Sequence, residues 1–384
     1  MTSNNQIPYG RHNVSKQDIE AVSKILRGDW LTTGPAVEEF ESRLKDLAEA
    51  EAVVVSSGTA ALHCAYAGVG IKPGDEIITT PLTFIATQAT AALLGAKIVF
   101  ADTQSDTGNI DPTQIESKIT KKTKAITIVD YAGHPCEIDE IKSIARKYGL
   151  YLIEDASHSI GSTYKNKPVG GLADITTFSF FPTKNVTTGE GGAVLSNNTD
   201  LLNRARKFGR QGLVRNAEEF VLTSDGPWHQ EVHEFGLNYR LPDVLCALGI
   251  SQLEKLGEFR LERQRLFSKY VEYLSCIPEV KLPAKRDYVD PMWHLFPLRV
   301  PSNFRKELYT HLRAEGFLVQ VNYFPAHLHP VFSHQHSLGD FPNSEKYYSE
   351  EISLPMFVDF TLFTDEYFER LTSTIQTFLV QRKR

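Results

Sequence analysis

The chain has 384 residues, more than one ordinary hydrophobic core supports, so a large domain and a smaller one are expected. Its 41 basic and 47 acidic residues leave a net charge of -6, which excludes a broad basic surface for nucleic acid or an anionic membrane. The polar N-terminus has no apolar stretch of the signal-peptide kind, and the four widely spaced cysteines suit neither a metal site nor a disulfide framework. A cytoplasmic protein with reduced thiols, no metal and no membrane contact is expected.

Two patterns alternate between about residues 36 and 200. Apolar residues recur at helical spacing in 37–47 and again in 138–148. The short apolar runs between such segments are too short for helices and too continuously apolar for strands with one exposed face. We therefore predict an α/β fold in which these runs are central strands of a mostly parallel sheet covered on both faces, at 52–57, 97–102, 124–133, 151–157, 175–181 and 193–197.

Residues Ser57, Gly58 and Thr59 stand between the strand predicted at 52–57 and an alanine-rich helix. Free backbone N–H groups at a helix start, with hydroxyls beside them, form an anion site that needs no basic residue. The same residues also suit an ordinary helix cap. The segment is thus a candidate phosphate site, with the plain cap as the alternative.

The run at 77–96 carries no charge and is long enough to cross a membrane, but it contains five threonines, Gln88 and Pro81. It predicts a buried strand followed by a buried helix. Phe84, near the end of that strand, could stack on a flat heteroaromatic ring, although an aromatic residue in such a run is by default part of the core.

Asp155 ends the apolar strand YLIED, and in open parallel sheets ligands bind beyond the carboxyl ends of the strands. A buried carboxylate there needs a partner, and a protonated pyridine nitrogen would be one. The alternative is a helix N-cap before ASHSIG. His158, three residues later, could lie over such a ring or be an ordinary buried histidine.

Lys184 is the only charged residue between Asp174 and Glu190, and it follows a strand that carries the hydroxyl of Ser179. Desolvation would lower its pKa and free the amine as a nucleophile toward an aldehyde, whereas the alternative is a surface lysine on a loop. Together with Asp155 and a local phosphate site, Lys184 indicates pyridoxal 5'-phosphate (PLP), an electron sink whose ring nitrogen must stay protonated.

From about residue 239 the sequence becomes a long, charged, helix-prone stretch, followed by alternating apolar runs and further helix-like segments from 277 to 384. We expect a large PLP-binding domain at 1–250, with the N-terminal segment, and a smaller C-terminal α+β domain at 251–384.

Ordered motifs along the chain resemble the sugar aminotransferases of the DegT/DnrJ/EryC1/StrS family. They are SSGTAAL (56–62), TTPLTFIAT (79–87), EDASHSIGS (154–162), FSFFPTKNVTTGEGGAV (178–194), GLNYRLPDVLCALGISQL (236–253) and VQVNYFPAHLHP (319–330). The resemblance implies the aspartate-aminotransferase-like fold of PLP-dependent transferases (fold type I), PLP as cofactor and a homodimer with shared active sites.

Carried over by residue, the resemblance implies that Lys184 forms the Schiff base and later carries the proton, while Asp155 pairs with the pyridine nitrogen. Phe84 and His158 would flank the ring. The phosphate contacts would come from Ser57, Gly58, Thr59 and Ser179, with Asn238 of the neighbouring subunit. Contacts to the sugar substrate would come from Tyr9, Trp30, Leu31, Thr32 and Tyr323.

Within the family, TGNIDPTQIESKI, VDYAGHPCEIDEI and GPWHQEV most resemble members that aminate a UDP-linked 4-keto-6-deoxy-N-acetylhexosamine in pseudaminic acid biosynthesis, with glutamate as donor and 2-oxoglutarate as product. Other nucleotide 4-keto sugars are alternatives: UDP-4-keto-arabinose and GDP- or dTDP-linked 4-keto-6-deoxyhexoses. A PLP sugar dehydratase would have histidine in place of Lys184, and a non-catalytic regulator would have an extra domain. Phe181 and Asn322 stand where many members have histidine, which leaves the substrate side open.

Overall fold

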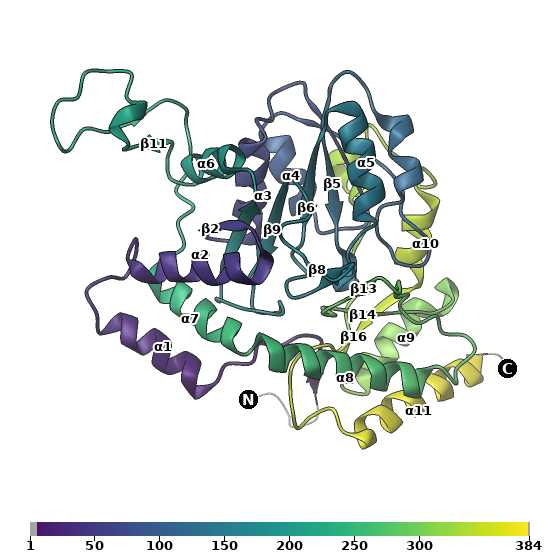
Figure 1. Cartoon of the computed structure of the whole chain (residues 1–384). Helices are drawn as coiled ribbons and strands as arrows, with labels where there is room; N and C mark the ends of the chain where they lie inside the picture. The colour runs from purple at the N-terminus through teal and green to yellow at the C-terminus, as the bar shows by residue number, and fades with distance from the viewer. Residues whose placement is uncertain (1–5, 383–384) are drawn as a thin grey trace.

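A seven-stranded sheet forms the centre of the computed structural model, which describes residues 6–382 (Figure 1). Its strand order is β2-β10-β9-β6-β5-β3-β4, and the neighbours from β9 to β4 run parallel. The prediction of an α/β fold with a mostly parallel sheet is thereby confirmed. The strands are β2 Glu51–Val55, β3 Glu76–Thr79, β4 Lys97–Phe100, β5 Thr123–Val129, β6 Tyr151–Asp155, β9 Ile175–Ser179 and β10 Gly192–Ser196.

Three of the predicted central strands differ in detail from the expectation. Strands β2 and β4 lie at the two edges of the sheet, and β10 runs antiparallel to both β2 and β9. A parallel neighbour needs a long crossover, usually a helix, whereas β9 and β10 are joined only by the loop 180–191. This loop carries Lys184 back across the end of the sheet.

Helices cover both faces of the sheet, because neighbouring residues of each strand point to opposite sides. On β3, Ile77 packs in the core beneath α3 Gly58–Gly68, α4 Ala86–Leu93 and α6 Thr199–Phe208. Ile78 packs on the other side with α5 Ile138–Tyr148, and α2 Pro35–Ala48 and α7 Asp243–Glu254 cover the rest of that face. The run at 77–96 is thus the buried strand and helix that its composition predicts.

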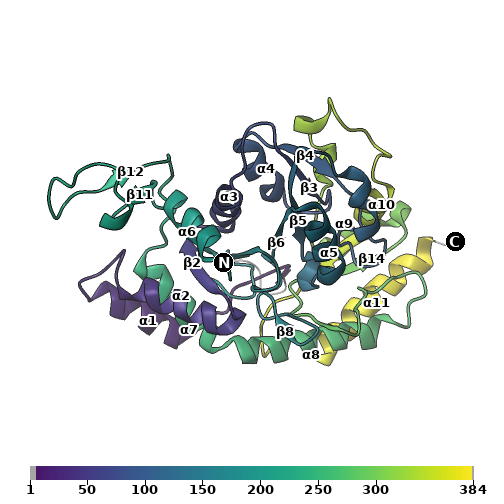
Figure 2. The ribbon, with the colours of Figure 1, turned by 45° about the horizontal axis from the view of Figure 1, so that its top comes forward.

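The helix-prone stretch from 239 folds as two helices, α7 and α8 Leu256–Leu274, that meet at Lys255 and run along one side of the molecule (Figures 1 and 2). Helix α8 packs into a second core with the C-terminal elements, which include β14 Phe296–Arg299, β16 Glu351–Leu354, α9 Ser302–Ala314, α10 Pro342–Glu350 and α11 Asp365–Arg382. Among residues 6–382, no helix is long and apolar enough to span a membrane.

The N-terminal segment packs beside the C-terminal elements. Strand β1 Ile7–Pro8 pairs in parallel with β15 Phe317–Leu318, and Ile7 belongs to the second core. Helix α1 Lys16–Leu26 then packs against α7. The division into domains at residue 250 stays a proposal. The pairing of β1 with β15 links the two proposed domains.

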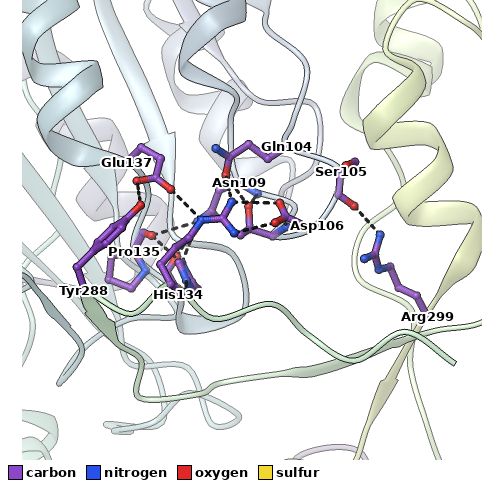
Figure 3. Close-up of polar contacts among 11 residues, drawn as sticks. Gln104, Ser105, Asp106, Asn109, His134, Pro135, Glu137, Tyr288 and Arg299 are labelled. Carbon is purple, nitrogen blue, oxygen red and sulfur yellow. Dashed lines mark hydrogen bonds and ion pairs between the residues drawn. The ribbon is translucent and has the colours of Figure 1, made fainter. Parts of the chain in front are cut away.

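A polar cluster also ties the sheet to the C-terminal part, as Figure 3 shows. Arg286 donates 2.7 Å to Asp106 and 3.2 Å to Glu137, which Tyr288 also contacts. Arg299 of β14 donates 2.6 Å to the carbonyl of Ser105. The remaining short strands are β7 Thr163–Tyr164, β8 Lys167–Pro168, β11 Leu213–Val214, β12 Glu231–Val232 and β13 Val289–Asp290.

One segment projects from the body in both views, the arm at 213–236 that contains β11 and β12 (Figures 1 and 2). Several of its large apolar side chains are exposed, among them Leu222, Trp228 and Phe235, the last at 96%.

Candidate active site

A cavity of about 480 Å³ lies beyond the carboxyl ends of the parallel strands. Val129 ends β5, Asp155 ends β6 and Ser179 ends β9, and all three line the cavity. This is the position where open parallel sheets bind ligands, because strand ends of one direction meet at one edge.

Lys184 lines the cavity from the loop that joins β9 to β10. Within residues 6–382 its Nζ has no assigned hydrogen bond or ion pair. Burial lowers the pKa of Lys184 to about 8, and the charge of Asp155 opposes that shift only in part. A larger fraction of the side chain is therefore the free, nucleophilic amine at neutral pH than for an exposed lysine.

Asp155 is 5% exposed, and both of its carboxylate oxygens accept hydrogen bonds from neutral hydroxyls. Thr87 of α4 donates to Oδ2 over 2.8 Å, and Ser157 donates to Oδ1 over 2.6 Å. No helix follows Asp155 between residues 156 and 162, so the helix-cap alternative is wrong. These hydroxyls fix the carboxylate without neutralising it.

The candidate phosphate corner lies at the first turn of α3. Ser57 is the N-cap of this helix, and its hydroxyl accepts the N–H of Ala60 over 3.0 Å. The side chain of Ser57 is therefore an ordinary helix cap, the alternative raised by the sequence. Gly58 approaches Ser179 so closely that a Cβ would lie 2.7 Å from the Cβ of Ser179 and 2.8 Å from its Oγ. With Thr59, these residues line the cavity at the positive end of the helix.

An aromatic wall completes the cavity. Phe84 is 57% exposed and faces the cavity rather than the core, with its ring centroid 6.1 Å from that of Tyr323. His158 Nε2 lies 3.0 Å from the hydroxyl of Tyr323, and the His158 ring is 4.4 Å from that of His294. Burial holds the pKa of both histidines well below the usual value, so both rings are neutral.

Among the predicted substrate contacts, Tyr9 and Tyr323 line the cavity. Trp30, Leu31 and Thr32 lie exposed on the loop between α1 and α2, outside the cavity lining. Asn238 is likewise exposed, and its backbone forms a bridge with Arg210. One chain alone therefore does not bring these four residues to Lys184.

Sequence reasoning missed several residues that line the cavity or fix its groups, namely Thr87, Ser157, His294 and Gln320. Nothing in their local sequence separates them from ordinary polar residues, although the hydroxyls of Thr87 and Ser157 sit in motifs that resemble the family. Phe181, at 46% exposure, and Asn322 also line the cavity, so both departures from the family pattern face the same space.

The residues present fit PLP. The carboxylate of Asp155 contacts only neutral donors and remains available to a cationic ring nitrogen. A buried amine and a helix N-terminus with hydroxyls line the same cavity. The exposed face of Phe84 and the neutral ring of His158 suit a flat heteroaromatic ring. Fold and site together define a PLP-dependent enzyme of the aminotransferase class.

The chain belongs to the DegT/DnrJ/EryC1/StrS aminotransferase family, whose sequence model matches residues 12–375. It is 39% identical to the UDP-4-amino-4,6-dideoxy-N-acetyl-beta-L-altrosamine transaminase of Campylobacter jejuni, over 91% of this chain and 92% of that protein. PLP is its cofactor, and the chain is an enzyme.

Two solved structures extend the comparison. Helicobacter pylori PseC, an aminotransferase of pseudaminic acid biosynthesis, aligns with a TM-score of 0.89 and 31% identity over 97% of this chain and 99% of PseC. Spr1654 of Streptococcus pneumoniae, assigned to the sugar aminotransferases and solved in its PLP-form, aligns with a TM-score of 0.89 and 26% identity, over 97% of this chain and 98% of Spr1654.

Proposed function

We propose that this enzyme transfers the amino group of glutamate to C4 of a UDP-linked 4-keto-6-deoxy-N-acetylhexosamine, a step in pseudaminic acid biosynthesis. The single observation that carries the chemistry is that the buried amine of Lys184 shares a cavity with the carboxylate of Asp155, which only neutral donors hold. The choice of sugar is supported by the relatives from Campylobacter jejuni and Helicobacter pylori, which share most of the length of this chain.

The side chains divide the work of such a transfer. Bound PLP supplies an aldehyde that exchanges amino groups and a ring that withdraws electrons from the reacting carbon. The Lys184 amine takes the proton from the donor's α-carbon in the first half of the transfer and gives a proton to C4 of the sugar in the second half. Asp155, held by Thr87 and Ser157, provides the negative charge that favours a protonated ring nitrogen.

We also propose a cytoplasmic homodimer in which each site uses residues of both chains. Three features support this arrangement, because none of them contributes to the cavity of its own chain. They are the exposed Asn238, the exposed loop at 30–32 and the arm at 213–236 with its exposed apolar side chains. A second copy that covers the cavity mouth would give all of them a place in the site.

The test loads the purified enzyme as its pyridoxamine form and offers UDP-, GDP- and dTDP-linked 4-keto-6-deoxy sugars together with UDP-4-keto-arabinose. We expect amination of the UDP-linked N-acetylhexosamine at a kcat/KM at least about tenfold above the others. Preference for another sugar would replace the proposed substrate. In parallel, borohydride should fix the cofactor covalently to Lys184 and not to the variant Lys184→Ala, and an adduct on another lysine would remove the proposed chemistry.

A further inference from the structure

Tyr9 and Asn322 meet on the cavity wall formed by the C-terminal part of the chain. The parallel pairing of β1 with β15 places Tyr9 next to the segment that follows β15. Asn322 Nδ2 donates to the Tyr9 hydroxyl over 3.1 Å, and both residues line the cavity that contains Lys184. Two polar groups from distant parts of the sequence therefore share one patch of the wall.

A buried relay on β16 fixes the orientation of Asn322. Glu351 is fully buried, and its Oε2 accepts the backbone N–H of Asn322 over 2.8 Å. Its Oε1 accepts the hydroxyl of Ser353. Because this hydroxyl gives its hydrogen to Glu351, Ser353 Oγ can only accept from Asn322, whose Nδ2 lies 3.0 Å away.

Both amide hydrogens of Asn322 are thus used within the protein, one by Ser353 and one by Tyr9. The amide oxygen Oδ1 is the polar atom that remains for the cavity. The Tyr9 hydroxyl accepts from Asn322 and keeps its own hydrogen, since burial raises the pKa of Tyr9. Within residues 6–382, no acceptor is assigned to that hydrogen, so the pair offers one donor and one acceptor side by side.

If the hydrogen bonds of this relay run in the opposite direction, Tyr9 and Asn322 still offer one donor and one acceptor to the cavity. A proton on Glu351 would make Glu351 the donor to Ser353, and the Ser353 hydroxyl would then donate to the amide of Asn322. The amide would have to flip, so that Oδ1 and Nδ2 exchange places. Asn322 would present Nδ2 as a donor and Tyr9 its hydroxyl oxygen as an acceptor. In either state, a group that both donates and accepts satisfies the pair, and a hydroxyl does both.

We propose that Tyr9 and Asn322 together bind one hydroxyl of the sugar ring and thereby help to determine substrate specificity. This inference rests on the proposed function. In a UDP-linked 4-keto-6-deoxy-N-acetylhexosamine, C1 carries the nucleotide, C2 the acetamido group, C4 the ketone and C6 only hydrogens. The sole free ring hydroxyl is the one on C3, next to the ketone, and it is the group we assign to Tyr9 and Asn322.

The test measures binding rather than turnover. The enzyme in its PLP form holds no amino group to transfer, so a 4-keto nucleotide sugar binds without reacting. Calorimetry compares the 3-hydroxyl sugar with its 3-deoxy analogue on the wild type, on Tyr9→Phe and on Asn322→Leu. Tyr309→Phe and Asn203→Leu are matched controls outside the cavity. Unfolding temperature and PLP content establish that each variant folds.

We expect the wild type and both controls to bind the 3-hydroxyl sugar about tenfold or more tightly than the 3-deoxy sugar, since two hydrogen bonds are lost. Tyr9→Phe and Asn322→Leu should each reduce this ratio to about threefold, because each variant keeps one of the two hydrogen bonds. If Asn322→Leu does not fold, Tyr9→Phe decides. A wild-type ratio near one, or variants that keep the full ratio, would assign the pair to structure alone. Failure of the wild type to bind either sugar would refute the proposed substrate itself.

Discussion

Thr87 Oγ1 donates a 2.8 Å hydrogen bond to Asp155 Oδ2, which joins the first turn of α4 to the end of β6. Ser157 holds the other oxygen of the same carboxylate. The backbone N–H of Ser157 also donates to Oδ1, so neutral donors hold the buried carboxylate in a fixed direction and no cationic side chain within residues 6–382 is paired with it. It can therefore attract a cationic ring nitrogen more strongly than a carboxylate paired with arginine or lysine.

Asp155→Asn should retain PLP yet lose turnover by about a hundredfold or more. The amide cannot favour a protonated ring nitrogen, whereas the groups at 57–59 and 179 that we assign to the phosphate are unchanged. Absorbance of bound PLP and kcat measure the two effects separately. Thr87→Val, which keeps the charge and loses only its orientation, should have a smaller effect. Near-normal turnover of Asp155→Asn would contradict the assigned role.

Enzyme freed of its cofactor should recombine with PLP faster as the pH rises through about 8. Only the uncharged amine attacks the aldehyde, and burial lowers the pKa of Lys184 to about 8, so the reactive fraction grows up to that pH and then levels off. Stopped-flow absorbance follows the reaction. A lysine peptide, with a pKa of about 10.4, serves as control. A rise that appears only near pH 10 would show that Lys184 is not desolvated.

Gly58→Ala should weaken PLP retention by about tenfold, although alanine favours helices over glycine. The added Cβ would lie 2.7 Å from the Cβ of Ser179, whose backbone is fixed in β9, so one of the two residues must shift within the candidate phosphate corner. Gly257→Ala on α8 is the control, because its Cβ meets nothing within 4 Å. Dialysis against buffer measures retention, and equal retention in the two variants would contradict the prediction.

Arg286→Ala should lower the free energy of unfolding by about 1–3 kcal/mol, because Asp106 and Glu137 lose a partly buried partner that links the sheet to the C-terminal part. Chemical denaturation measures the loss. Arg43→Ala removes an exposed pair with Glu39 on α2 and should cost less than about 0.5 kcal/mol. Equal stability of the two variants would mean that the cluster in Figure 3 does not hold the two parts together.

The chemical centre of the site could be predicted because its parts stand at strand ends. Asp155 and Lys184 each follow a continuous apolar run, and parallel strands bring such ends to one edge. Thr87 and His294 could not be found this way, since their place in the cavity depends on packing between segments distant in sequence. The pairing of Tyr9 with Asn322 depends likewise on the β1–β15 contact across the whole chain.

The sheet was predictable in type but not in order. An apolar run that helices cover on both faces has the same sequence pattern in an edge strand as in a central strand. The pattern therefore predicts β2 and β4 as central strands, although they lie at the edges. The antiparallel β10 follows from the short loop before it, a signal visible in the sequence but weaker than the apolar pattern. Trp30, predicted as a substrate contact, lies outside the cavity of its own chain, and Asn238 does so too, as its predicted role in the neighbouring subunit's site requires.

The last prediction is that Asn238 acts on the partner's site. Asn238→Ala should weaken PLP retention, and Lys184→Ala should be inactive, each as a homodimer. In a heterodimer of the two, one chain has an intact lysine and the other an intact asparagine.

If Asn238 reaches across, these two intact residues meet in one site, and the heterodimer regains about half of the wild-type activity and PLP retention when the sites work independently. If Asn238 acts within its own chain, neither site contains both residues and nothing is regained. Co-expression with two different tags isolates the heterodimer, and a heterodimer of Lys184→Ala with the wild type gives the reference for one working site. Activity well below that reference would contradict a role of Asn238 in the partner's site. The structure favours that role, because Asn238 is exposed and does not line the cavity of its own chain.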